Sequence, residues 1–137
     1  MSDLTELAHA SMPFAAAIGL RDVSGDSSGV TAHADWAEDR CTVGGVLHGG
    51  YLMALADSVG AMCAALNLPE GAAGTSTIES KTNFLRAATD GEITVTSTPV
   101  HAGRKTIVIQ TDITRADGKL VTRTTQTQTV LSPLAEA

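Results

Sequence analysis

The sequence has few aromatic residues and few charges. Phe, Trp and Tyr make up 3% of the chain, and Asp, Glu, Lys and Arg make up 18%, with a net charge of −6 at pH 7. Proteins that bind nucleic acids stack bases on aromatic side chains and present an excess of Lys and Arg to the phosphates. The composition therefore argues against a nucleic-acid partner.

Cysteines and long apolar runs are also scarce. Cys41 and Cys63 are too few and too far apart for a disulfide framework or a zinc pattern, and the four histidines show no metal-ligand spacing. No apolar run approaches the roughly 20 residues of a membrane span, and the N-terminus is acidic where a signal peptide is basic. We therefore expect a cytoplasmic protein with no metal and no membrane partner.

The first half of the chain combines short elements with one long helix. The 137 residues are 43% apolar, which is enough for a single domain over residues 1–137. A short helix is predicted at 3–10, with Ser2 or Asp3 available as its cap. Two strands are predicted at 18–24 and 28–36, followed by a glycine-rich stretch at 41–50 with no regular element and a helix at 51–67.

The predicted helix at 51–67 has an apolar stripe with the 3.6-residue period of an α-helix. The stripe consists of Leu52, Leu55, Ala56, Val59, Met62, Cys63 and Leu66. The other side carries only small residues, without Lys, Arg or Glu, namely Ala54, Gly60, Ala61, Ala64 and Ala65. A helix of this kind is expected to be buried on all sides.

The rest of the chain is rich in Thr, Val and Ile, which favour β-strands. Strands are predicted at 76–87, 91–101, 105–115 and 119–131. The connections between them are short and contain no helix, which favours an antiparallel meander. One long helix and one antiparallel sheet give an α+β fold, with the helix on the concave face of the sheet.

Asp57 is the one formally charged residue between Arg40 and Glu70. By helical geometry it lies on the small-residue face. A carboxylate in apolar surroundings needs partners, a shifted pKa or a function. The small neighbouring residues argue against a merely exposed carboxylate and favour a functional role, while an exposed position and a structural hydrogen bond stay open as alternatives.

His48, Gly49 and Gly50 immediately precede the predicted helix. The N–H groups at a helix N-terminus are unpaired and carry the positive end of the dipole, which suits a polarised carbonyl. Asp57 follows Gly49 by eight residues, a rise of about 12 Å, so one subunit cannot bring both to one carbon. An antiparallel pair of such helices could do so in a two-fold dimer. A tight turn would also explain the glycines, and a capping role would also explain His48.

Two further groups could bind a ligand. Arg104 and Lys105 fall in a predicted hairpin turn, where they could contact a phosphate or be ordinary solvated residues. Thr77 begins a strand and could present its hydroxyl near the helix N-terminus, although β-propensity explains it as well. The chain contains no P-loop, zinc-protease motif or dinucleotide fingerprint.

The segment 46–58, with His48 and Gly49 followed by Asp57, resembles the hotdog-fold acyl-CoA thioesterases. Within that family it resembles the branch related to the phenylacetate-pathway and 4-hydroxybenzoyl-CoA thioesterases. The resemblance extends over nearly the whole chain, through residues 13–19, 77–86, 101–105 and 117–121. It implies a long central helix wrapped by a curved antiparallel sheet, and subunits paired into dimers and dimers of dimers.

The resemblance also implies roles for individual residues. The Gly49 N–H would contact the thioester carbonyl, and Asp57 of the opposing subunit would be the nucleophile or the general base. His48 would shape the site, Thr77 would contact the acyl group or the water, and substrate-binding positions would include Gly50 and Ser58. Arg104 and Lys105 would meet the phosphates of CoA. Many family members carry Asn or Gln six residues before the His, where this chain has Thr42.

The resemblance implies no metal or redox cofactor, since CoA is part of the substrate. The leading hypothesis is hydrolysis of an acyl-CoA, with an aryl or medium-chain acyl group, to a free acid and CoA. A non-catalytic acyl-CoA-binding module and a hotdog hydratase or dehydratase are the alternatives.

Overall fold

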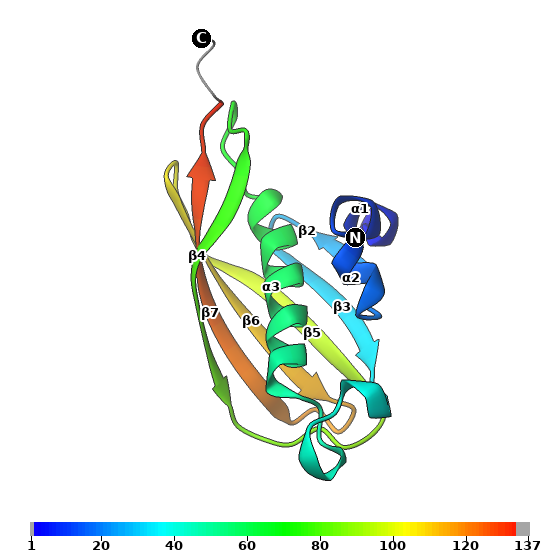
Figure 1. The fold of residues 1–137 in the computed structure, drawn as a ribbon. Helices are drawn as coiled ribbons and strands as arrows, with labels where there is room; N and C mark the ends of the chain where they lie inside the picture. Colours follow the sequence, from blue (N-terminus) through cyan, green and yellow to red (C-terminus); the bar gives the residue numbers. More distant parts are fainter. Residues whose placement is uncertain (1, 134–137) are drawn as a thin grey trace.

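The computed structural model describes residues 2–133 and has the hotdog fold. A long helix, α3 (Gly49–Ala65), lies against one face of a curved seven-stranded antiparallel sheet (Figure 1). The α+β prediction and the place of the helix on the concave face are confirmed. No helix of residues 2–133 has both the length and the apolar character that a bilayer crossing requires.

The strands follow the order β1-β2-β3-β5-β6-β7-β4 across the sheet. Their bounds are β1 Ser2–Asp3, β2 Arg21–Asp26, β3 Gly29–Asp35, β4 Gly74–Phe84, β5 Glu92–Ala102, β6 Thr106–Arg115 and β7 Leu120–Leu131. The six longer strands lie within three residues of their predicted bounds. β1, a two-residue strand, was not predicted.

The prediction of a simple meander is wrong for one strand. β5, β6 and β7 pair in sequence, but β4 pairs with β7 and forms an edge of the sheet. The connection 85–91 crosses the end of the sheet to reach β5 and is held by the N–H groups of Leu85 and Arg86 on the carbonyl of Val121. Seven extended residues span about 23 Å, more than the three strand spacings of about 4.8 Å each that the crossing requires.

The N-terminal segment forms two short helices rather than one. α1 (Thr5–Ser11) begins two residues later than predicted, after Leu4, although the Asp3 carboxylate does accept a hydrogen bond from the Thr5 N–H at 3.0 Å. α2 (Pro13–Ala17) was not predicted; proline at its first position has a φ already suited to a helix. Two 3₁₀ turns, η1 (Glu38–Arg40) and η2 (Val43–Gly45), precede α3.

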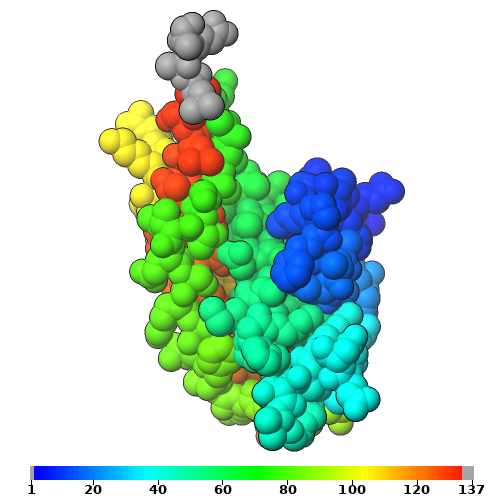
Figure 2. Space-filling model, viewed as in Figure 1, coloured from blue at the N-terminus to red at the C-terminus, as the bar shows by residue number. Residues whose placement is uncertain are grey.

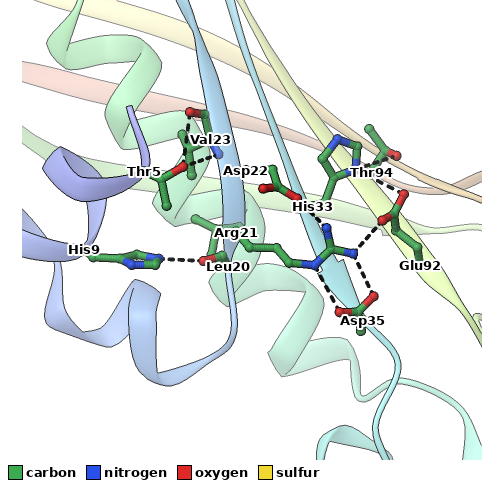
Figure 3. Close-up of polar contacts among 10 residues, drawn as sticks. All are labelled: Thr5, His9, Leu20, Arg21, Asp22, Val23, His33, Asp35, Glu92 and Thr94. Carbon is green, nitrogen blue, oxygen red and sulfur yellow. Dashed lines mark hydrogen bonds and ion pairs between the residues drawn. The ribbon is translucent and has the colours of Figure 1, made fainter. Parts of the chain in front are cut away.

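Side chains of the N-terminal segment attach it to the sheet (Figure 3). The Thr5 hydroxyl accepts a hydrogen bond from the Val23 N–H at 2.9 Å, and the His9 ring contacts the Leu20 carbonyl at 2.6 Å. Arg21 of β2 reaches Asp35 of β3 and Glu92 of β5, and these two carboxylates raise its pKa. Because this ion-pair cluster is exposed, it contributes little net stability and acts chiefly by joining three strands.

The predicted apolar stripe of the long helix forms the centre of the core. Six of its seven residues are buried, and Leu66, just beyond the helix, is partly buried. They pack on inward-facing side chains of β5 and β6, which include Ile93, Val95, Ile107, Ile109 and Ile113. Burial of each such Leu or Ile side chain contributes roughly 1.5–3 kcal/mol.

Contrary to the prediction, α3 is not buried on all sides, because its outer face is partly exposed. Met53 is 38% exposed, Asp57 is exposed, and Ala54 and Ala61 are partly buried. Figure 2 shows this part of α3 at the surface between β4 and the N-terminal helices. The sheet covers one side of the helix, and no element of the described residues 2–133 forms a layer over the other side.

Candidate active site

The N-terminus of α3 is capped by the residue that precedes it. His48 has an extended backbone, and its Nδ1 accepts a hydrogen bond from the Gly50 N–H at 2.8 Å. This cap starts the helix at Gly49, two residues earlier than predicted. Within residues 2–133 the Gly49 N–H has no hydrogen-bond acceptor. It is therefore free to bind an oxygen at the positive end of the helix dipole.

Gly49 lies on an open hollow of about 440 Å³ that also includes Thr42, Leu52, Phe84 and Arg86. The Phe84 ring packs so closely on Gly49 that a β-carbon there would lie 3.0 Å from the ring. The structure thus brings two of the predicted residues, Thr42 and Gly49, to one hollow.

Asp57 lies two turns further along α3, on the edge of a second hollow of about 390 Å³. This hollow is lined by Phe14, Gly50, Met53, Ala54, Asp57, Thr77 and Ser80. Asp57 Oδ1 accepts two hydrogen bonds, from the Thr77 hydroxyl at 3.0 Å and from Gln126 Nε2 at 3.1 Å. The sequence predicts the Thr77 hydroxyl near the helix N-terminus, whereas the structure places it on Asp57, two turns further along α3.

Two glutamines of β7, which the sequence analysis did not identify, belong to the same cluster. Gln126 and Gln128 are fully buried, and Gln128 Nε2 donates to the Thr77 hydroxyl oxygen at 2.7 Å. The Thr75 hydroxyl lies 3.0 Å from Gln128 Oε1. A possible signal was present in the sequence: four polar residues occupy alternate positions of this strand and share its inward face, Thr122, Thr124, Gln126 and Gln128.

The other predicted site residues are distributed over both ends of the helix. Gly50 lines the Asp57 hollow, with its N–H occupied by His48. Ser58 is 9% exposed and its hydroxyl donates to the Ala54 carbonyl at 2.8 Å, so it does not line this hollow. Arg104 and Lys105 are exposed in the β5–β6 turn. Arg104 lines a shallow hollow with Pro69 and Glu70, beyond the C-terminal end of α3 and thus far from Gly49 of the same protomer.

Within residues 2–133, no three His, Cys, Asp or Glu side chains come together as a metal-binding group. The chemical features of the site are therefore the Asp57 carboxylate with two donors on one oxygen, the free Gly49 N–H at the helix N-terminus, and open space beside each. This arrangement can polarise a carbonyl and activate water or attack a carbon, provided that the two halves meet.

Comparisons with known proteins agree with this chemistry. The family model for the thioesterase superfamily matches residues 44–122, which include His48, Gly49, Asp57 and Thr77. A Haemophilus influenzae protein named as a candidate esterase is 38% identical over 76 residues, 56% of this chain and 54% of that protein. The chain thus spans about half the length of the first curated relatives that it matches.

Solved structures match over almost the whole chain. A thioesterase from Haemophilus influenzae has a TM-score of 0.85 and 28% identity, and the match covers 97% of this chain and 91% of that one. A hypothetical thioesterase from Streptococcus pneumoniae, solved with coenzyme A, has a TM-score of 0.80 and 26% identity, covering 93% and 99%. The family model, which matches more than half of the chain, and the matched fold lead to one conclusion: this chain belongs to the thioesterase superfamily.

Proposed function

We propose that this protein hydrolyses an acyl-CoA thioester to a free carboxylic acid and CoA. The observation that carries the proposal is the Asp57 carboxylate, held at Oδ1 by Thr77 and Gln126 beside an open hollow. Water supplies an oxygen and a proton in the overall reaction: the C–S bond breaks, a C–O bond forms, and CoA leaves as the thiol. No metal or redox cofactor is needed for this chemistry.

The Gly49 N–H supplies the second half of the site. A thioester carbonyl placed at this N–H gains negative charge on its oxygen as the carbon is attacked, and the helix dipole stabilises that charge. His48 contributes by capping the helix, since its bond to the Gly50 N–H leaves the Gly49 N–H free. Thr42 lines the Gly49 hollow and Gly50 lines the Asp57 hollow, and we place the substrate in these two hollows; Ser58 adjoins Asp57 in the chain but lines neither.

Asp57 acts as nucleophile or as general base. As a nucleophile it forms an anhydride with the acyl group and releases CoA, and water then hydrolyses the anhydride. As a base it takes a proton from the water that attacks the thioester. Thr77, which donates to Asp57, is placed to contact the acyl group or that water.

We propose that each site combines residues of two copies of the chain. Gly49 and Asp57 are separated by a rise of about 12 Å along one helix, so they cannot meet at one carbon within a protomer. β4 is an edge strand whose outer N–H and C=O groups pair with no other strand of residues 2–133, and it carries exposed Ile78 and Phe84. A two-fold dimer with antiparallel α3 helices would place Asp57 of one copy near Gly49 of the other.

The same pairing explains the two basic residues at the far end of the helix. Antiparallel helices place the C-terminal end of one beside the N-terminal end of the other, so Arg104 and Lys105 of one copy would approach the second copy's Gly49. There they would bind the phosphates of CoA. Pairing of two such dimers into a tetramer, in the cytoplasm, completes the proposed assembly.

The lining of the Asp57 hollow favours an apolar acyl group. Phe14, Met53 and Ala54 form its apolar part, and Phe14 is 62% exposed in the protomer. An exposed aromatic side chain beside a candidate catalytic group is suited to bind an aryl or medium-chain acyl group.

Thiol release from a panel of aryl- and alkyl-CoA esters tests the proposal, with the wild type beside Asp57→Asn. The asparagine keeps the shape and an acceptor for Thr77, but it removes the basic carboxylate. We expect the rate to fall about 100-fold or more. Glu6→Gln, which removes an exposed acid of α1, is the charge-matched control and should retain full activity.

Other outcomes identify the alternatives. Unchanged hydrolysis in Asp57→Asn would contradict the proposed role of this residue. Tight binding of CoA esters without turnover would indicate a binding module. Hydration of an enoyl-CoA without thiol release would indicate a hydratase.

A further inference from the structure

We propose that Gln126 is a positioning residue that holds Asp57 Oδ1 and leaves Oδ2 as the oxygen that reacts. This inference rests on the proposed function and assigns a role to a residue outside the segment that the family model matches. It follows from three observations: the direction of the hydrogen bonds, the packing of Gln126 against Gly60, and the absence of a donor on Oδ2.

Both hydrogen bonds on Asp57 go to the same oxygen. Thr77 and Gln126 donate to Oδ1, at 3.0 and 3.1 Å, and no donor of residues 2–133 reaches Oδ2. Two donors from two different strands, β4 and β7, fix both the position and the rotation of the carboxylate. Oδ2 keeps its lone pairs free for a proton or a carbon.

The amide of Gln126 is held with its N–H₂ group toward Asp57. Its Oε1 is buried, has no hydrogen-bond partner among residues 2–133 and lies against Gly60, so close that a β-carbon at Gly60 would overlap it. The reversed amide would place Oε1 against Asp57 Oδ1, two acceptors facing each other. An unpartnered buried acceptor lowers the stability of the fold. Here that acceptor is Oε1 of the same amide whose Nε2 donates to Asp57.

The donor direction of Thr77 is fixed in a similar way. Gln128 Nε2 donates to the Thr77 oxygen at 2.7 Å, so the Thr77 hydroxyl proton is directed toward Asp57. Gln128 is itself oriented by the Thr75 hydroxyl, 3.0 Å from Oε1. The two buried glutamines of β7 therefore direct two donors toward one carboxylate oxygen.

Steady-state kinetics of Gln126→Met tests this role. Methionine has a similar volume but no donor, so Asp57 can rotate while the core stays filled. We expect kcat to fall about 10- to 100-fold with KM nearly unchanged, because the substrate contacts remain. Gln110→Met on β6, a partly buried glutamine that does not contact Asp57, is the matched control and should keep the wild-type kcat.

Nuclear magnetic resonance gives a readout that does not depend on turnover. The chain has three glutamines, Gln110, Gln126 and Gln128, so ¹⁵N-glutamine labelling gives three side-chain amide signals. We expect a Gln126 amide proton to be shifted downfield by the carboxylate, and Asp57→Ala to remove this shift while the Gln110 signal stays in place.

The outcomes separate this inference from the proposed function. The positioning role would be overturned by a folded Gln126→Met variant with the wild-type kcat. It would also be overturned by a Gln126 amide signal that stays at the same chemical shift in Asp57→Ala. In both cases the wild type would still hydrolyse the thioester. A wild type that hydrolyses no ester would overturn the proposed function and, with it, the positioning role. A fall in kcat together with the loss of the amide shift would support the inference.

Discussion

Gly60 of α3 faces the amide of Gln126 of β7 at a distance that leaves no room for a β-carbon between them. The glycine lets a polar side chain of the sheet reach under the helix to Asp57 on its outer face. The contact therefore joins the core of the fold to the candidate site.

Gly60→Ala tests this packing. In an ordinary helix interior the change stabilises a protein by up to about 1 kcal/mol, but here the added methyl group displaces Gln126. We expect the free energy of unfolding to fall by about 1–3 kcal/mol, measured by urea denaturation, and thioester hydrolysis to fall with it. In the double variant Gly60→Ala with Gln126→Ala, the steric conflict is gone. If the double variant loses as much stability as the Gly60→Ala and Gln126→Ala single variants lose together, the contact is contradicted.

Two substitutions of Gly49 distinguish the loss of its N–H from the effect of a larger side chain at this position. Gly49→Pro removes the N–H at the first helical position, where proline fits a helix, whereas Gly49→Ala adds a side chain and keeps the N–H. Both substitutions press on the Phe84 ring. We expect kcat/KM for thioester hydrolysis to fall about 100-fold or more in Gly49→Pro and much less in Gly49→Ala. Equal losses would assign the effect to the ring and contradict a role for the N–H.

Mixed assemblies test whether two copies share a site. Gly49→Pro and Asp57→Asn chains, unfolded together and refolded, form hybrid dimers in which one site has both native residues. We expect thiol release to recover in the mixture although each variant alone is slowed about 100-fold or more. No recovery, with hybrid dimers demonstrated by mass spectrometry, would place both groups in one protomer and contradict the shared site.

The edge strand β4 is the expected contact between copies. Ile78 on β4 is 65% exposed in the protomer, and Val100 on β5 is 64% exposed and serves as its control. We expect Ile78→Lys to shift the protein toward monomer in sedimentation velocity and to abolish hydrolysis. Val100→Lys should leave the assembly and the activity unchanged. If the Val100→Lys protein dissociates while the Ile78→Lys protein stays assembled, the interface does not lie at β4.

The alkaline limit of stability depends partly on Cys63. Burial raises the pKa of this thiol from 9.0 to about 11. Between these values the unfolded chain loses the proton and the folded chain keeps it, so the contribution is complete below pH 9.0 and is lost toward pH 11. We expect the free energy of unfolding to fall across this range, and to fall less steeply in Cys63→Ala. Parallel pH profiles for the two proteins would contradict this account.

Local patterns were sufficient to identify most elements of the fold. The period of the stripe from Leu52 to Leu66 predicts a helix and its buried face, and the β-branched composition predicts the later strands, because both signals depend on neighbours in the sequence. His48, Gly49 and Asp57 could also be singled out, since a lone acid in a small-residue helix after a glycine pair is a local feature.

The pairing of β4 with β7 and the partners of Asp57 depend on contacts between distant parts of the chain. Gln126 lies 69 residues from Asp57 and reaches it only because β7 passes beneath α3 and Gly60 leaves space for the amide. The sequence alone determined the long helix, the approximate extent of the six longer strands and the candidate carboxylate. Only the tertiary structure decided which strand is the free edge and which side chains hold Asp57, because hydrogen bonds and packing between remote segments have no periodicity in the sequence.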